Sequence, residues 1–108
     1  MIINKVNVLQ EFAAIERPWS PKTIGRLNGQ SVKIAIFKDE FIMHKHSDED
    51  ELFYVIEGTI YLQFEDHTQI ITAGEFCIVP KDTLHKPYAL EPAKVMLFEP
   101  DSTVRTGD

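Results

Sequence analysis

Four residues of this chain have the types and spacing that metal chemistry requires. His44 and His46 are separated by one residue, so both imidazoles point to the same face if the segment is extended. Glu51 follows across an acidic turn, residues 48–50, which lets the next strand fold back and bring a carboxylate to that face. Two imidazoles and one carboxylate are a common ligand set for Fe(II), Mn(II), Ni(II) and Zn(II). His85 would add a fourth nitrogen and leave coordination positions open to water or substrate.

Each part of this pattern also has a plain structural explanation. A His-x-His pair occurs by chance on solvent-facing strands, and Glu51 belongs to an acidic run that could be only a solvated turn. The elements that surround the four residues are therefore needed to distinguish a metal site from a chance arrangement.

Those elements have the pattern of a β protein. Asn28-Gly29 is a strong hairpin signal and separates predicted strands at 22–27 and 31–37. In the second of these, Val32, Ile34 and Ile36 alternate with polar or small residues, as expected for a half-buried strand. Further strands are predicted at 41–46, 52–56, 60–64, 69–72, 76–79, 85–90 and 94–99. Short strands at such regular intervals indicate a sandwich or barrel.

Both ends of the chain lie outside this pattern. We expect one domain over 1–108, with an N-terminal arm at 1–21, a barrel at 22–99 and a polar surface tail at 100–108. Residues 8–15 favour a short helix or an extended arm. Trp19, between Pro18 and Pro21, is expected to act as a lid or to pack at an edge.

Composition excludes several classes of function. The 17 acidic and 11 basic residues give a net charge of −6, and the basic residues form no patch, which argues against a nucleic-acid partner. No apolar run is long enough for a membrane span or a secretory signal, so a cytoplasmic location is expected. Cys77, the single cysteine, lies in an apolar segment and is expected to be a small core residue, with a nucleophilic role as the alternative. His67 is expected at the surface of a turn.

The spacing around the four residues resembles the cupin superfamily. The first cupin motif, G(X)5HXH(X)3,4E(X)6G, is matched by His44, His46, Glu51 and Gly58. The second, G(X)5PXG(X)2H(X)3N, is matched by Gly74, Pro80 and His85. The sequence departs from these motifs at Lys38, Asp82 and Ala89, which replace two glycines and an asparagine that are not metal ligands.

The resemblance implies an all-β fold, the double-stranded β-helix or jelly-roll barrel. It implies one divalent transition metal, Fe, Mn, Ni or Zn, held by His44, His46, Glu51 and His85. It also implies a homodimer, because cupins of this size commonly dimerise.

Strand parity predicts the lining of the pocket beside such a metal. Ile42 shares the face of His44 and His46, and Phe53 and Val55 share the face of Glu51. These three residues are predicted to form an apolar wall. Arg26 and Tyr88 could reach a substrate, although a structural role is expected for each.

Two functions follow, and the sequence assigns a catalytic residue to neither. The first is a metalloenzyme acting on a small molecule, with dioxygenase chemistry favoured over sugar-isomerase chemistry. A phosphosugar would need inward Arg or Lys residues, and the predicted strands show no such cluster. The alternative is a non-catalytic module that binds a small molecule and keeps a structural metal.

Overall fold

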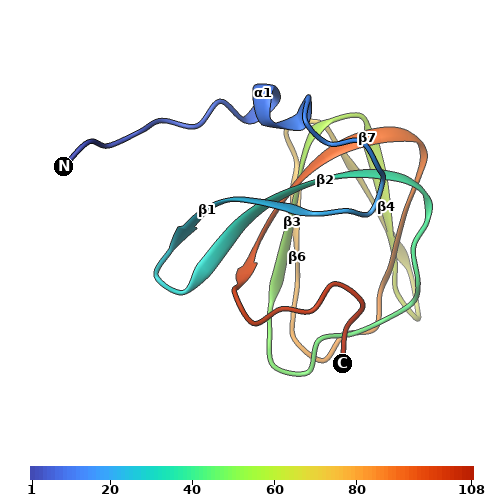
Figure 1. Ribbon diagram of the computed structural model, residues 1–108. Coiled ribbons are helices and arrows are strands. Elements are labelled where there is room, and N and C mark those ends of the chain that lie inside the picture. The colour runs from blue at the N-terminus through green and yellow to red at the C-terminus, as the bar shows by residue number, and fades with distance from the viewer.

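Strands dominate the computed structural model, which describes residues 1–108 (Figure 1). One short helix, α1 (Val8–Phe12), precedes seven strands. The strands are β1 (Lys22–Leu27), β2 (Gln30–Glu40), β3 (Glu51–Glu57), β4 (Thr59–Gln63), β5 (Thr68–Thr72), β6 (Phe76–Val79) and β7 (Lys86–Pro100). All strand pairs are antiparallel. The all-β jelly-roll predicted from the sequence is therefore confirmed.

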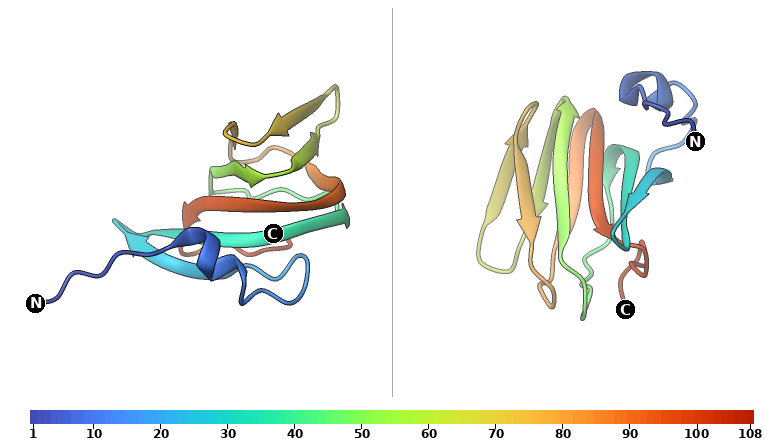
Figure 2. Two further views of the ribbon diagram at one scale, coloured as in Figure 1. Left: turned by 90° about the horizontal axis from the view of Figure 1, so that it is seen from above. Right: turned by 90° about the vertical axis from the view of Figure 1, so that its left-hand side faces the viewer.

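The last strand, β7, connects the two sides of the barrel (Figures 1 and 2). Its second half lies between β2 and β3 in the order β1-β2-β7-β3-β6, and its first residues pair with β4, which also pairs with β5. Residues 90–92 of β7 face the single residue Lys38 of β2, because the register shifts there. The sequence predicted two strands, 85–90 and 94–99; the structure has one strand that bulges between them.

The hairpin between β1 and β2 forms at the predicted place. Asn28 and Gly29 both have positive φ, 52° and 77°. Two consecutive residues of this kind make the two-residue turn whose twist matches that of antiparallel strands.

The two faces of β2 are covered differently from what the alternating pattern suggested. Ala35 and Phe37 belong to the core, whereas Ile34 is buried on the opposite face, where α1 contacts the strand. Val32 and Ile36 are only half-buried. Because the N-terminal segment covers the outer face, the apolar alternation no longer indicates which side faces the interior. Lys33 therefore lies on the inner face.

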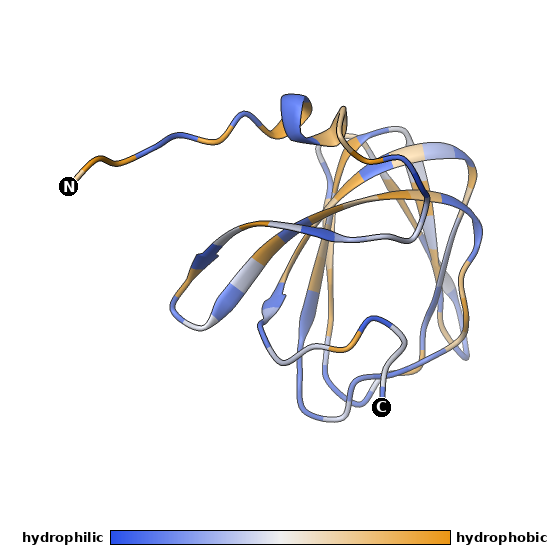
Figure 3. Cartoon of the chain, in the orientation of Figure 1, coloured by the Kyte–Doolittle hydropathy of each residue, from blue (hydrophilic) through white to orange (hydrophobic).

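Hydrophobic side chains from every strand except β1 fill the barrel, and the hydrophobic stretches of Figure 3 follow these strands. The buried cluster consists of Ala35, Phe37, Phe53, Val55, Ile60, Leu62, Ile71, Val79, Ala89, Ala93, Val95 and Leu97. Cys77 is half-buried and packs against this cluster.

The segment 41–46 is not the strand that the sequence predicted. It is irregular and joins the sheet by a single bridge between His44 and His85. The first residues of the chain extend away from the barrel before α1, as Figures 1 and 2 show. The helix α1 is too short to span a membrane.

Candidate metal centre

The backbone brings the two halves of the candidate site together. The His44 N–H donates to the His85 carbonyl and the His85 N–H donates to the His44 carbonyl, both at 2.9 Å. The Asp82 N–H donates to the His46 carbonyl at 2.7 Å. These bonds place two segments about 40 residues apart in the sequence side by side at one end of the barrel.

Asp82 explains one departure from the second cupin motif. Its φ is 61°, in the left-handed region that favours glycine, and aspartate is among the few other residues that adopt it. Its carboxylate also pairs with Lys45 at 2.9 Å. The replacement therefore preserves the turn that carries His85.

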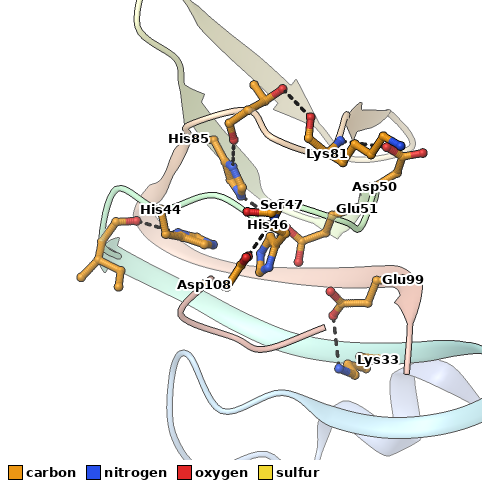
Figure 4. A network of polar contacts seen from close by, with 12 residues as sticks. Lys33, His44, His46, Ser47, Asp50, Glu51, Lys81, His85, Glu99 and Asp108 are labelled. Atoms are coloured by element: carbon orange, nitrogen blue, oxygen red, sulfur yellow. Dashed lines mark hydrogen bonds and ion pairs between the residues drawn. The ribbon is translucent and has the colours of Figure 1, made fainter. Parts of the chain in front are cut away.

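The acidic turn before Glu51 is anchored. The Asp50 carboxylate accepts a hydrogen bond from the Lys81 N–H at 2.8 Å. This bond ties the start of β3, and with it Glu51, to the turn that precedes His85 (Figure 4).

Two of the histidine rings are oriented by backbone carbonyls. Nδ1 of His44 lies 2.9 Å from the Ile42 carbonyl oxygen, and Nδ1 of His85 lies 2.9 Å from that of Thr83. A carbonyl only accepts, so Nδ1 carries the proton and Nε2 is left as the acceptor. Metal-binding histidines are commonly oriented in this way.

The ligand atoms of the four residues converge. Each of His44, His46, Glu51 and His85 offers one atom to a group whose members all lie within 4.8 Å of one another. Glu51 Oε1 lies 3.3 Å from His85 Nε2 and 3.6 Å from His46 Nε2 (Figure 4). All four residues are buried.

Several of these atoms have no hydrogen-bond partner in the protein. They are both ring nitrogens of His46, Nε2 of His85 and Oε1 of Glu51. A buried polar atom without a partner is costly, and the great majority in folded proteins are paired. Three imidazoles and one carboxylate that face a common point are the donor set that a divalent transition metal takes. The residues present therefore fit a metal ion.

Burial sets the charge state of this cluster. It lowers the pKa values of His44, His46 and His85, so that the imidazoles are neutral, the form that binds metals. Neighbouring imidazoles lower the pKa of His46 further. Burial raises the pKa of Glu51. A bound cation would favour the ionised carboxylate and the neutral imidazoles together.

A small cavity of about 50 Å³ adjoins the cluster. His44 and Glu51 line it together with apolar side chains from several elements. The apolar residues are Trp19, Pro21, Ala35, Phe37, Phe41, Phe53, Pro87 and Leu97. Lys33, Glu99 and Arg105 are its other charged residues.

Of the five pocket residues predicted from parity and position, only Phe53 lines this cavity. Ile42 is 49% exposed, because the segment that carries it is irregular and does not alternate like a strand. Val55 is fully buried in the core and does not line the cavity. Arg26 pairs with Asp101 at 3.3 Å, and Tyr88 stacks on Tyr61 with ring centroids 4.8 Å apart.

Trp19 closes one side of the cavity, in the lid or edge position expected for it. Its ring lies 4.4 Å from that of Phe37 and 4.9 Å from that of Phe41, centroid to centroid. Its indole N–H donates to the Lys38 carbonyl at 2.8 Å, and its own carbonyl accepts from Arg105 at 2.6 Å.

The C-terminal tail packs at the same end of the barrel, which the sequence did not indicate. Asp108 accepts from the Ser47 N–H at 2.8 Å through its carboxylate, and its own N–H donates to the Lys45 carbonyl at 3.1 Å. The tail thus holds the segment that carries His44 and His46.

Lys33 and Glu99 were missed by sequence reasoning. They pair at 3.4 Å inside the barrel, with side chains 15% and 5% exposed. Glu99 shares strand parity with the buried Val95 and Leu97, a signal that would have placed it inside. Burial, reinforced by the neighbouring Glu51, raises the pKa of Glu99 to about 8, and this outweighs the opposing effect of Lys33.

Two other sequence candidates lie away from the centre. His67 is exposed, as expected, and pairs with Asp66 at 2.7 Å. Burial raises the pKa of the Cys77 thiol, which disfavours the thiolate that a nucleophile requires.

Known proteins share this architecture. Among curated sequences, the uncharacterized protein YdbB of Bacillus subtilis (strain 168) is 37% identical over 65 residues, which cover 59% of this chain and 58% of YdbB. The matched segment therefore spans less than two thirds of that relative.

Solved structures also match most of this chain. A cupin-2 domain containing protein from Shewanella frigidimarina NCIMB 400 is 38% identical with a TM-score of 0.86, covering 88% of this chain and 93% of that one. Protein NMB1881 from Neisseria meningitidis is 27% identical with a TM-score of 0.83, covering 91% of this chain and all of that one (100%).

A family model described as "Cupin domain" matches residues 34–99. This segment is more than half of the chain and runs from β2 to β7, so it contains both motifs and all four clustered residues. The sequence match and the shared barrel lead to the same conclusion: this chain belongs to the cupin domain family.

Proposed function

We propose that this protein binds one divalent transition metal through His44, His46, Glu51 and His85 and acts with it on a small molecule. The observation that carries the proposal is the set of converging, buried ligand atoms that no protein group satisfies. Fe, Mn, Ni and Zn all suit this ligand set. When bound, such an ion supplies Lewis acidity toward a substrate oxygen and, in the case of iron, redox chemistry.

The chain's own residues would orient the ligand set and keep water out. The Ile42 and Thr83 carbonyls hold two imidazoles with Nε2 toward the site. Trp19, Phe37 and Phe53 form apolar walls beside it. A water-excluding wall strengthens the electrostatic interactions of whatever binds there.

The lining supports dioxygenase-type chemistry on an enolate-like substrate over phosphosugar isomerisation. Only Lys33 brings a cation into the cavity from the strands, and Glu99 already pairs with it. Arg105, the other cation, is engaged with the Trp19 carbonyl. A phosphate would find no free cluster of basic groups here.

Elemental analysis of the purified protein tests the metal. We expect about one metal ion per chain in the wild type, and its loss in a His46→Ala/His85→Ala double variant. His67→Ala is the matched control, because that imidazole is exposed and does not belong to the cluster. Equal metal content in the wild type and the double variant, after reloading with Fe, Mn, Ni or Zn, would contradict the proposal.

A turnover screen then separates an enzyme from a binding module. Oxygen consumption is measured with diketones, thiols and catechols on the metal-loaded protein. Turnover that disappears in the double variant supports the metalloenzyme. Tight ligand binding without turnover across the panel favours the non-catalytic module with a structural metal.

The homodimer stays a prediction. Phe76 and Ile78 on the edge strand β6 are 60% and 54% exposed, which is compatible with a covering partner.

A further inference from the structure

Lys33 and Glu99 place an amine and a carboxyl group together in a position where folding alone does not require them. They lie on the inner faces of β2 and β7, on neighbouring strands, where Glu99 is directly opposite Ser31. Their side chains are only 15% and 5% exposed. Burying such groups away from water is costly, and well-packed apolar residues often replace a buried pair of this kind without loss of stability. The pair therefore calls for an explanation other than stability.

The pair has unused hydrogen-bonding capacity. Glu99 Oε2 is buried without a partner in the protein, while Oε1 faces Lys33 Nζ at 3.4 Å. Lys33 has three N–H donors and this one ion-pair partner. Both residues line the cavity beside Glu51 (Figure 4). One free acceptor and at least one free donor thus face the same small space.

The rest of the cavity restricts what this space can hold. Its other walls beside the pair are mainly apolar, among them Phe37, Phe53 and Leu97. A dry cavity of about 150 Å³ holds benzene. The volume of about 50 Å³ found here therefore admits only the polar end of a ligand.

We propose that Lys33 and Glu99 form a subsite that binds the hydroxyl group of an α-hydroxycarbonyl substrate. A hydroxyl both donates, here to Glu99, and accepts, here from Lys33, so it matches the two groups. Glu51 and His44, two of the proposed metal ligands, line the same cavity as this pair. A second substrate oxygen on the adjacent carbon would then face the proposed metal ligands. This inference rests on the proposed function for the role of that second oxygen, but the hydroxyl contact itself does not need a metal.

Fluorescence of Trp19, the single tryptophan, provides the test, because its ring lines the cavity. Acetoin (3-hydroxybutan-2-one) is the probe, and butan-2-one, which lacks only the hydroxyl, is its matched control. Both are titrated into zinc-loaded and metal-free protein. The variants are Lys33→Met, Glu99→Gln and the double variant. Lys86→Met is the protein control, since Lys86 pairs with Glu40 between the same two strands but outside the cavity.

We expect the wild type to bind acetoin at least about tenfold more tightly than butan-2-one, the scale of a hydrogen bond to a charged group. Each variant of the pair should lose this preference, and Lys86→Met should retain it. The double variant leaves no unpaired buried charge, so it is the control for a folding defect that an unpaired charge would cause in a single variant. Zinc content is measured in parallel.

The two proposals fail in different ways. A wild type that binds acetoin no better than butan-2-one, or a preference unchanged in the double variant, overturns the subsite. A wild type that retains none of Fe, Mn, Ni and Zn after reloading overturns the proposed function, and the comparison in metal-free protein still decides the subsite.

Discussion

In the metal-free protein, the Glu99→Gln variant should be more stable than the wild type, and the difference in the free energy of unfolding should grow as the pH rises. The substitution keeps the shape of the side chain but removes a carboxyl group whose pKa is raised from 4.5 to about 8 by burial and by Glu51. A carboxyl group with a raised pKa in the folded state stabilises that state fully below its unfolded pKa. The contribution is lost as the pH rises through the folded pKa. The relevant window is therefore pH 4.5 to about 8.

The magnitude follows from the same two values. Each pH unit within the window costs the wild type about 1.4 kcal/mol relative to the variant. The difference reaches about 3 kcal/mol at pH 7 and about 5 kcal/mol above pH 8. Solvent screening reduces this free-energy difference only slightly, because Glu99 is 4% exposed. The pKa of about 8 already includes the opposing effect of Lys33, so no separate correction for that pair is needed.

Urea unfolding in the presence of a chelator measures the effect. The free energy of unfolding is determined at pH 5, 6, 7 and 8 for the wild type, Glu99→Gln and Glu57→Gln. Glu57 is a matched control because it pairs with Lys94 at the surface, where its side chain is 64% exposed. The three histidines titrate in all three proteins, so subtracting the curves removes most of their contribution.

The variant and wild-type curves should diverge with rising pH, and the control should stay parallel to the wild type. If the difference between the wild type and Glu99→Gln is the same at pH 5 and pH 8, Glu99 does not carry the proton that its burial implies. The interpretation of the inner carboxylates would then be wrong.

Three further predictions concern packing, the tail and the metal. Leu62→Ala should lower the free energy of unfolding by about 2–5 kcal/mol in urea, because Leu62 is fully buried; a loss below 1 kcal/mol would contradict the core assignment. Gly107→Ala should cost about 1–3 kcal/mol, since φ is 81° and a Cβ would lie 2.4 Å from the Lys45 carbonyl oxygen; an unchanged melting temperature would mean that the tail does not pack there. Zinc at about 100 times its Kd should raise the melting temperature at pH 7.5 by about 10–20 °C. Burial lowers the pKa values of the ligand histidines from 6.5, so the stability that their neutral forms contribute should decline as the pH falls below 6.5; a zinc effect that does not weaken at any pH down to acid unfolding would exclude these imidazoles as ligands.

The hairpin and the candidate ligands could be predicted because their signals are local. Asn28-Gly29 selects its turn through backbone conformations that only a few residues adopt readily. His44 and His46 are separated from Glu51, the first residue of β3, by a single turn. In the second motif, Asp82 has a positive φ and replaces glycine in the turn before His85.

Predictions that depended on strand parity failed where the backbone departs from regular geometry. Ile42 was expected to line the pocket, but 41–46 has one bridge and no continuing ladder. The inner face of β2 could not be recognised, because the N-terminal segment also buries Ile34 on the outer face.

The sequence by itself determined the fold class, the hairpin and the grouping of His44, His46 and Glu51, since these follow from residue type and short-range spacing. The place of His85 in the ligand set came from the resemblance to the cupin motifs. Only the tertiary structure decided that Lys33 and Glu99 meet inside the barrel and that the C-terminal tail holds the segment of His44 and His46. Those contacts join residues more than 60 positions apart. Which distant side chains meet depends on strand order, register and bulges, and local spacing contains none of these.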